Sequence, residues 1–228
     1  MTCSLETFAG DSTHLYRLAY APNAWQFPDW SHAREGGTFG NRWDDPQAIY
    51  RVLYASAQRV GTFLETLARY RPDPMVAAAL DEISGDDEPL PGPGFLPRRW
   101  IADRVLGEAD SGGTFARVSS AHSLDYLRVA MAGSLVRHGI DDLDAATIRQ
   151  RSPRSFTQEI SRLIYECTED DRRSYDGVYY ESRLGDEIQN FALFEPAALT
   201  VGESVPLDES DPDLQGVLLR FGITLYDE

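Results

Sequence analysis

The chain contains no lysine, because all 21 of its basic residues are arginine. Without lysine there is no Schiff base to a pyridoxal phosphate cofactor and no phosphate-binding lysine of a P-loop. Anion recognition must therefore depend on arginine side chains and backbone amides, and the planar guanidinium group suits two-point contacts with phosphate. A bias in codon usage explains the absence of lysine equally well.

Cysteine and histidine are also scarce. Cys3 and Cys167 are too few for a disulfide framework, and we expect Cys3 to lie in a frayed terminus. The four histidines are scattered, without HExxH or CxxC spacing, so we expect no metal site. Neither a GxSxG motif nor a GxGxxG motif after a strand is present, which argues against a nucleophile elbow and a Rossmann cofactor site.

Long apolar runs are missing as well. The longest, residues 75–80, is far too short to span a bilayer, and the start of the chain lacks the basic and apolar segments of a signal peptide. We therefore expect a cytoplasmic protein. The net charge of −16 argues against binding nucleic acid, which requires clustered cations, and against docking on an anionic membrane.

The length of 228 residues fits one domain over 1–228. Periodicity predicts strands at residues 14–20, 49–54, 99–106, 114–119, 177–180, 191–194 and 217–225. It predicts helices at 56–70, 74–83, 123–138, 143–149 and, from a capping-box pattern at 155–158, at 155–167. Strands toward both ends with helices between them favour an α+β fold. We interpret 71–175 as a helical excursion that includes a loop at 84–97, and 202–213 as an acidic segment.

Two arginines have positions that suit anion binding. Arg42 follows Gly40 in a loop, where a glycine lets the backbone approach a ligand closely and the arginine can contact a diphosphate. The alternative is a loop arginine paired with Asp44 or Asp45. Arg17 lies in an otherwise half-apolar strand, where a guanidinium group needs a partner such as a bound anion.

Three further polar side chains lie within or at the ends of predicted elements. Glu65 lies in a helix one turn after Gly61, whose small size leaves room for a ligand; alternatively Glu65 pairs with Arg69. Tyr54 ends a strand, where its ring can stack on a ligand or simply belong to the core. Ser182 also ends a strand, where its hydroxyl can bond a ribose or an amide, or only satisfy a turn.

The order and spacing of these residues resemble the RES-domain family, which is named for its Arg, Glu and Ser and whose members are bacterial toxins that destroy NAD. The resemblance covers residues 14–70 and 176–195. It rests on an arginine in the first strand, Gly-Asn-Arg-Trp at 40–43, a strand tyrosine, a helical glutamate, and a late Gly-x-x-Tyr-x-Ser segment followed by an Asn-aromatic strand. Where a lysine is expected before the Gly-Asn-Arg-Trp segment, this chain offers Arg34.

The resemblance implies an ADP-ribosyltransferase-like split mixed β-sheet surrounded by helices, with NAD as the substrate and no cofactor. It implies that a glutamate stabilises the cationic ribose formed as the bond to nicotinamide breaks. It assigns catalysis to Glu65, Arg42 and Ser182, and NAD binding to Arg17, Tyr54, Arg34 and Asn190.

The acceptor of the ribose stays open at this point. Water would make the protein a glycohydrolase, phosphate a phosphorylase, and a protein side chain an ADP-ribosyltransferase; we favour degradation of free NAD by phosphate or water. The resemblance also implies a helix-turn-helix antitoxin that plugs the cleft. The alternatives are a non-catalytic nucleotide-binding module and an interaction protein that uses its acidic surface.

Overall fold

The computed structural model describes residues 3–8, 12–34, 38–73, 75, 94–150 and 152–227. Apart from Met75, the predicted helix at 74–83 lies outside the described residues, as does most of the predicted loop at 84–97.

An eight-stranded sheet organises the chain, with the strand order β1-β6-β9-β10-β3-β2-β5-β11. The strands are β1 (Thr7–Phe8), β6 (Phe115–Arg117), β9 (Gly177–Ser182), β10 (Gly185–Phe194), β3 (Val52–Ser56), β2 (Thr13–Tyr20), β5 (Arg104–Ser111) and β11 (Leu199–Pro206). Neighbours are antiparallel except for β6 and β9, which are parallel. Strands β2 and β3 pair only through Tyr16 and Ser56, so the two halves of the sheet are joined through one bridge. The predicted α+β fold with a mixed sheet is confirmed.

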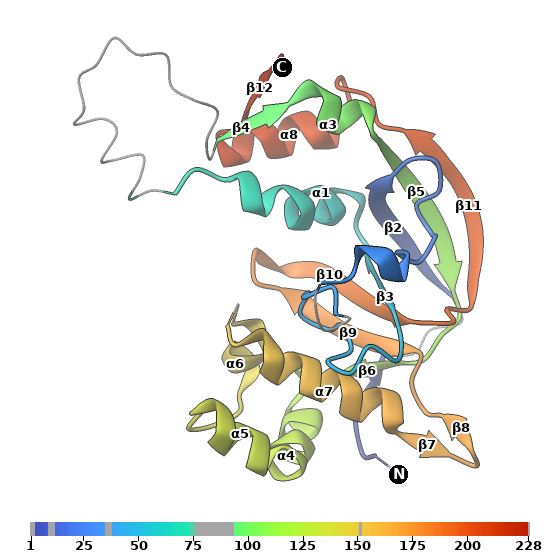
Figure 1. The fold of residues 1–228 in the computed structure, drawn as a ribbon, viewed down its shortest axis with the longest axis vertical. Coiled ribbons are helices and arrows are strands. Elements are labelled where there is room, and N and C mark those ends of the chain that lie inside the picture. The colour runs from blue at the N-terminus through green and yellow to red at the C-terminus, as the bar shows by residue number, and fades with distance from the viewer. Residues whose placement is uncertain are drawn as a thin grey trace.

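Helices flank the sheet in two groups (Figure 1). The first group, at the end that holds the C-terminus, comprises α1 (Arg59–Leu67) with its 3₁₀ extension (Ala68–Tyr70), α3 (Arg98–Ala102) and α8 (Pro212–Phe221), beside the pair β4 (Phe95–Pro97) and β12 (Thr224–Tyr226). The second group comprises α4 (Ala121–Ala130), α5 (Ala132–His138), α6 (Ala145–Arg149) and α7 (Arg154–Glu166), followed by the hairpin β7 (Thr168–Glu169) and β8 (Arg172–Arg173).

Alternation along the strands separates the cores. On β9, Val178 and Tyr180 join the cluster that contains Ile160 of α7, whereas Tyr179 belongs to the cluster on the other face with Phe191. A third cluster packs α1 against α3 and α8. Within α1, Phe63, Leu64 and Leu67 are buried, whereas Val60 is 38% exposed, so the apolar stripe of this helix is narrow.

The predicted strand at 217–225 is wrong, because most of it is helix α8. Asp211 caps this helix by accepting hydrogen bonds from the amides of Asp213 and Leu214, and Pro212 occupies its first turn. Gly222 ends the helix with a φ of 64°, a conformation that glycine adopts readily. The buried apolar positions of α8 recur at helical spacing, and strand β12 begins only after the glycine.

Four other expectations change in detail. The predicted strand at 99–106 is wrong in its first half, where α3 buries Trp100 and Ile101 before β5 begins. The capping box is wrong, because α7 begins at Arg154 and contains Ser155 within its first turn. The predicted helix at 123–138 is divided at Met131 into α4 and α5. Residues 71–175 also contribute β5 and β6 to the large sheet, so this segment is not helical throughout.

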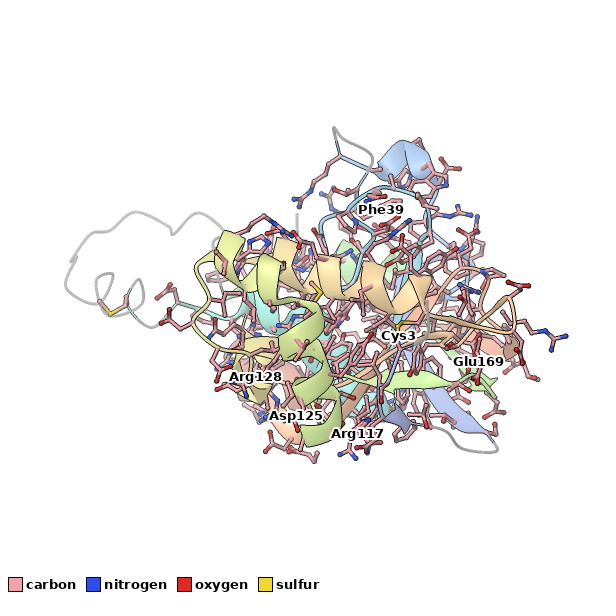
Figure 2. All side chains as sticks on the ribbon, turned by 90° about the horizontal axis from the view of Figure 1, so that it is seen from below. Cys3, Phe39, Arg117, Asp125, Arg128 and Glu169 are labelled. Carbon is pink, nitrogen blue, oxygen red and sulfur yellow. A yellow bond between two sulfur atoms is a disulfide. The ribbon has the colours of Figure 1, made fainter. Side chains whose placement is uncertain are left out.

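A disulfide joins Cys3 to Cys167, with 5.6 Å between their Cα atoms. The expectation of a frayed Cys3 is therefore wrong. Leu5 adds to the attachment, since it is buried and its backbone N–H and C=O both bond the hydroxyl of Tyr175. Figure 2 views this side of the protein and labels Cys3 beside α7.

Among the described residues, no helix combines the length and apolar character needed to cross a membrane.

Candidate active site

Glu65 of α1 meets the hairpin of β9 and β10. Its Oε1 accepts a hydrogen bond from Ser182 Oγ at 2.5 Å and another from Asn190 Nδ2 at 2.8 Å. Ser182 ends β9 and Asn190 lies on β10 opposite Tyr180. The structure thus brings together three of the predicted site residues, although Glu65 lies more than a hundred residues before the other two in the chain.

Close packing of α1 against the sheet places Glu65 there. A Cβ on Gly61 would lie 2.4 Å from Ser56 Oγ and 2.9 Å from Ile188 Cγ2, so only glycine permits this approach. The interpretation that Gly61 leaves room for a ligand is therefore wrong, because its neighbours fill that space. The alternative pairing with Arg69 is not observed, since the described partners of the Glu65 carboxylate are Ser182 and Asn190.

The Glu65 carboxylate is fixed on one side and open on the other. Ser182 and Asn190 are 1% and 2% exposed, whereas the Glu65 side chain is exposed. Ser182 Oγ in turn accepts a hydrogen bond from the amide of Leu184 at 2.9 Å. Within the described part of the chain, Glu65 Oε2 has no hydrogen-bond partner, so it can face a ligand.

Arg42 lies within electrostatic range of this carboxylate. Burial lowers the pKa of Arg42, while Tyr180 and Glu65 act in the opposite direction. Its Nη2 donates to the carbonyl of Arg149, the last residue of α6, at 3.0 Å. No ion pair with Asp44 or Asp45 is observed within the described residues, so the structural alternative for Arg42 is not supported.

Helix α7 holds the loop that carries Arg42. Residues at positions i, i+4, i+7 and i+8 share one face of a helix, and here they contact successive residues of the loop. The contacts are Arg154 Nη1 to Gly40 O (2.6 Å), Gln158 Nε2 to Asn41 O (2.8 Å), Ser161 Oγ to Trp43 O (2.6 Å) and Arg162 Nη1 to Asp45 Oδ2 (3.4 Å). No sequence pattern connects α7 with this loop.

Tyr54 holds the same loop through hydrogen bonds of its hydroxyl. Its hydroxyl donates to Asp44 Oδ1 at 2.8 Å and accepts from the amide of Trp43 at 3.0 Å. Burial, followed by the nearby Asp44, raises the pKa of Tyr54 well above its usual value. The hydroxyl therefore has a structural partner at each side, and stacking of the ring on a ligand stays a prediction.

Arg17 lies where the sheet halves meet. Its Nε donates to the carbonyl of Ala24 and its Nη1 to the carbonyl of Tyr54, both at 2.7 Å. Burial lowers the pKa of Arg17 to about 10. The contact with Tyr54 joins β2 to β3 beyond their single bridge, which is a structural role. The predicted contact of Arg17 with a diphosphate stays a prediction.

Arg34 lies close to the Arg42 loop. The side chain is exposed, and its guanidinium group lies over Gly40, where a Cβ would approach Arg34 Nη1 to 2.8 Å. Gly40 has a φ of 78°, so both its backbone and its neighbour favour glycine here. Arg34 is thus placed at the rim of the same region, where its role in NAD binding remains a prediction.

Tyr180 belongs to the site, although we assigned it no role from the sequence. Burial raises its pKa, with Glu65 acting in the same direction and Arg42 opposing it, so Tyr180 lies near both. Its ring also lies 5.5 Å from that of Trp43. The available signal was the alternation along β9, which puts Tyr180 and Ser182 on one face.

The candidate site is open and lies apart from a cavity in the second group of helices. That cavity, of about 520 Å³, lies between α5, α7 and residues 46–47, and none of the predicted site residues lines it. The described residues include no group of three or more His, Cys, Asp or Glu side chains placed to hold a metal ion. What the Glu65 cluster can offer chemically is a fixed carboxylate near an arginine.

Comparison with known proteins bears on the identity of this fold. The RES domain family matches residues 14–213. The fold is also similar to a chain in the crystal structure of the M. tuberculosis MbcT-MbcA toxin-antitoxin complex, with a TM-score of 0.52 and 14% identity over 93% of this chain and 90% of that chain. Among curated proteins no significant match is found.

Proposed function

The chain belongs to the RES-domain family, and on this premise we propose that it degrades NAD by cleaving the bond between nicotinamide and ribose. It acts as an NAD phosphorylase or an NAD glycohydrolase, depending on whether phosphate or water takes up the ribose. The observation that carries the proposal is the Glu65 carboxylate, which Ser182 and Asn190 hold through one oxygen while the other stays open.

The chemistry requires little more than this carboxylate. As the bond from the ribose carbon to the nicotinamide nitrogen breaks, positive charge develops on the ribose, and a fixed carboxylate stabilises it. The electron pair of the bond neutralises the pyridinium, so nicotinamide leaves as a neutral molecule without a general acid. An oxygen of phosphate or water then bonds the ribose carbon, and the water releases its proton to solvent.

Arginines hold the substrate in this proposal. Arg42 lies within electrostatic range of Glu65, Arg34 lies over Gly40 of the same loop, and Arg17 bonds the carbonyl of Tyr54. We assign cationic contacts with the diphosphate of NAD to these three arginines. Tyr54 places its ring near the nicotinamide. The net charge of −16 does not prevent this binding, because salt limits the reach of distant charges to about 8 Å.

A protein partner follows from the fold neighbour, which is a toxin-antitoxin complex. We propose that this chain is the toxin of such a pair, restrained by an antitoxin of the helix-turn-helix class that covers the Glu65 side. Free NAD as the substrate makes the cytoplasm the place of action.

Release of nicotinamide from NAD tests the enzymatic proposal. The wild type is compared with Glu65→Gln, which keeps the size and the accepting oxygen of the side chain but removes its charge. Glu203→Gln, an exposed glutamate of β11, is the matched control. We expect Glu65→Gln to lose about 10²–10³-fold in rate, as for removal of other electrostatic groups that stabilise a transition state, while the control is unchanged.

Addition of phosphate separates the acceptors. Release that depends on phosphate indicates a phosphorylase, and release that is independent of it a glycohydrolase. Equal rates for Glu65→Gln and the wild type contradict the role of Glu65. Binding of NAD without release supports a nucleotide-binding module, and labelled ADP-ribose on an added protein supports an ADP-ribosyltransferase, for which the open side of Glu65 leaves access.

A further inference from the structure

A second cationic pocket lies next to the Glu65 cluster. Its volume is about 260 Å³, and Arg71, Arg183, Leu184, Arg220 and Phe221 line it. The arginines come from three separate parts of the chain, namely the segment after α1, the turn between β9 and β10, and the last turn of α8. No acidic residue is among those lining residues.

This concentration of positive charge contrasts with the rest of the acidic chain. Several arginines elsewhere are neutralised by carboxylates, as in the pairs of Arg51 with Glu195 and Arg59 with Asp211. By contrast, Arg71, Arg183 and Arg220 form no ion pair with a carboxylate of the described residues. Like charges gathered in one pocket repel one another, and a bound anion removes that repulsion.

The pocket has a defined wall. The guanidinium carbon of Arg71 lies 4.7 Å from the centroid of the Phe221 ring, an arrangement that holds the planar group over the ring. Phe221 itself is 7% exposed, so this part of the pocket is rigid. Arg220 in the last turn of α8 also suits the helix dipole, but that explains one of the three arginines only.

The pocket adjoins the candidate active site through the turn after β9. Arg183 lies between Ser182, which bonds Glu65, and Leu184, whose amide bonds Ser182 Oγ. Arg71 follows the 3₁₀ extension of α1, the helix that carries Glu65. A group bound by these arginines is therefore close to the carboxylate.

We infer that the Arg71–Arg183–Arg220 pocket binds a phosphate group. A phosphate presents three or four oxygens to surrounding guanidinium groups, whereas a carboxylate presents two, and arginine is the side chain suited to such contacts. The phosphate has two candidate sources, inorganic phosphate as acceptor or a phosphate of the nucleotide. Which of these two sources supplies the phosphate rests on the proposed function, whereas the binding of a phosphate group does not.

Direct binding of inorganic phosphate gives the first test. Phosphate is titrated calorimetrically into the full chain at constant ionic strength, because salt screens exposed charges. The double variant Arg183→Gln/Arg220→Gln is compared with Arg128→Gln, an exposed arginine of α4 that pairs with Asp142 at the other end of the protein. We expect the double variant to bind at least about tenfold more weakly, since two charge-assisted contacts are lost, and the control to bind like the wild type.

Titration with ADP-ribose, which carries the nucleotide phosphates and no nicotinamide, gives the second test. Weaker binding of inorganic phosphate with unchanged binding of ADP-ribose assigns the pocket to an acceptor, and weaker binding of ADP-ribose, whether or not inorganic phosphate also binds more weakly, assigns it to a phosphate of the nucleotide. Affinities equal to those of the control for both ligands overturn the inference. Because these readouts need no turnover, a pocket that binds phosphate in a protein that releases no nicotinamide leaves this inference intact and removes only the enzymatic proposal.

Discussion

Ser182 Oγ donates to Glu65 Oε1 at 2.5 Å, joining the end of β9 to the middle of α1. The same oxygen of Glu65 accepts from Asn190, and the amide of Leu184 donates to Ser182. Two buried donors thus fix the direction of a carboxylate whose other oxygen is open. Fixed groups stabilise developing charge without the cost of reorganising at the moment of reaction.

Replacing Ser182 by alanine should separate this positioning role from binding. Glu65 keeps the Asn190 contact but loses one of its two donors, and the Leu184 amide loses its acceptor. We expect the rate of nicotinamide release to fall about 10–100-fold with a small change in KM, and stability to fall by about 1–2 kcal/mol. Steady-state kinetics and thermal unfolding measure the two effects.

Ser210→Ala is the control for that variant, because Ser210 Oγ also donates to a carboxylate, that of Asp208, which is not part of the Glu65 cluster. It should leave the kinetics unchanged. If Ser182→Ala changes KM alone, Ser182 contacts the substrate instead of orienting Glu65.

Loosening α7 from the Arg42 loop should weaken substrate binding. The double variant Arg154→Ala/Gln158→Ala removes the donors to the carbonyls of Gly40 and Asn41, and both side chains form these bonds at exposed positions. We therefore expect little loss of stability but an increase of about tenfold in KM for NAD, because Arg42 is less well positioned. Hydrogen exchange of residues 40–45 should become faster.

Arg137→Ala, on the neighbouring α5, provides the comparison, since it removes an exposed arginine that pairs with Glu159 and does not reach the loop. Unchanged KM and unchanged exchange in the double variant would show that the loop is held by its own contacts with Tyr54.

Elements that depend on local patterns could be predicted from the sequence. Strand β2 and helix α1 follow from the periodicity of their residues, and these elements carry Arg17 and Glu65. That Glu65, Ser182 and Asn190 belong together was indicated by their order along the chain; the hydrogen bonds between them depend on how α1 packs on the hairpin. No local pattern specifies that packing.

Other features could not be predicted because tertiary contacts decide them. The hydrogen bonds from α7 to residues 40–45 join segments more than a hundred residues apart. In the sequence, the side chains that donate them look like those of any solvent-exposed helix face. In α8, by contrast, Asp211, Pro212 and Gly222 were available signals for a helix. The β-prone residues at 217–225 favour a strand, but the helix that Asp211 and Gly222 cap forms instead.

Removing the hydroxyl of Tyr54 should give a loss of stability that depends on pH. Burial raises the pKa of Asp44, and its contacts with Tyr54 and Asn41 act against that rise. In Tyr54→Phe the carboxylate loses one donor and the Trp43 amide loses its acceptor. We expect a cost of about 2–3 kcal/mol at neutral pH, measured by urea unfolding.

The sign of the pH effect follows from the direction of the pKa shift. A carboxyl group whose pKa is raised in the folded state destabilises the fold as pH rises through that pKa, because the unfolded chain ionises more easily. Losing the Tyr54 donor raises the Asp44 pKa further, so the cost of Tyr54→Phe should be smaller near pH 4 than near pH 7.5. A cost that is equal at both pH values would show that Asp44 ionisation is not coupled to Tyr54.

Reducing the cross-link between Cys3 and Cys167 should destabilise the protein strongly. The bond closes a loop with a sequence separation of 164 residues, and the chain-entropy relation gives a stabilisation of about 5 kcal/mol for a loop of this length. The urea midpoint should therefore fall on addition of a reducing agent, and Cys3→Ala/Cys167→Ala should show the same lower midpoint with or without it. Because cytoplasmic thiols are usually kept reduced, counting free thiols in the denatured, non-reduced protein completes the test. Two free thiols together with an unchanged midpoint would show that the fold does not depend on this bond. If no free thiol is found, the bond has formed, and an oxidising step must precede full stability of the fold.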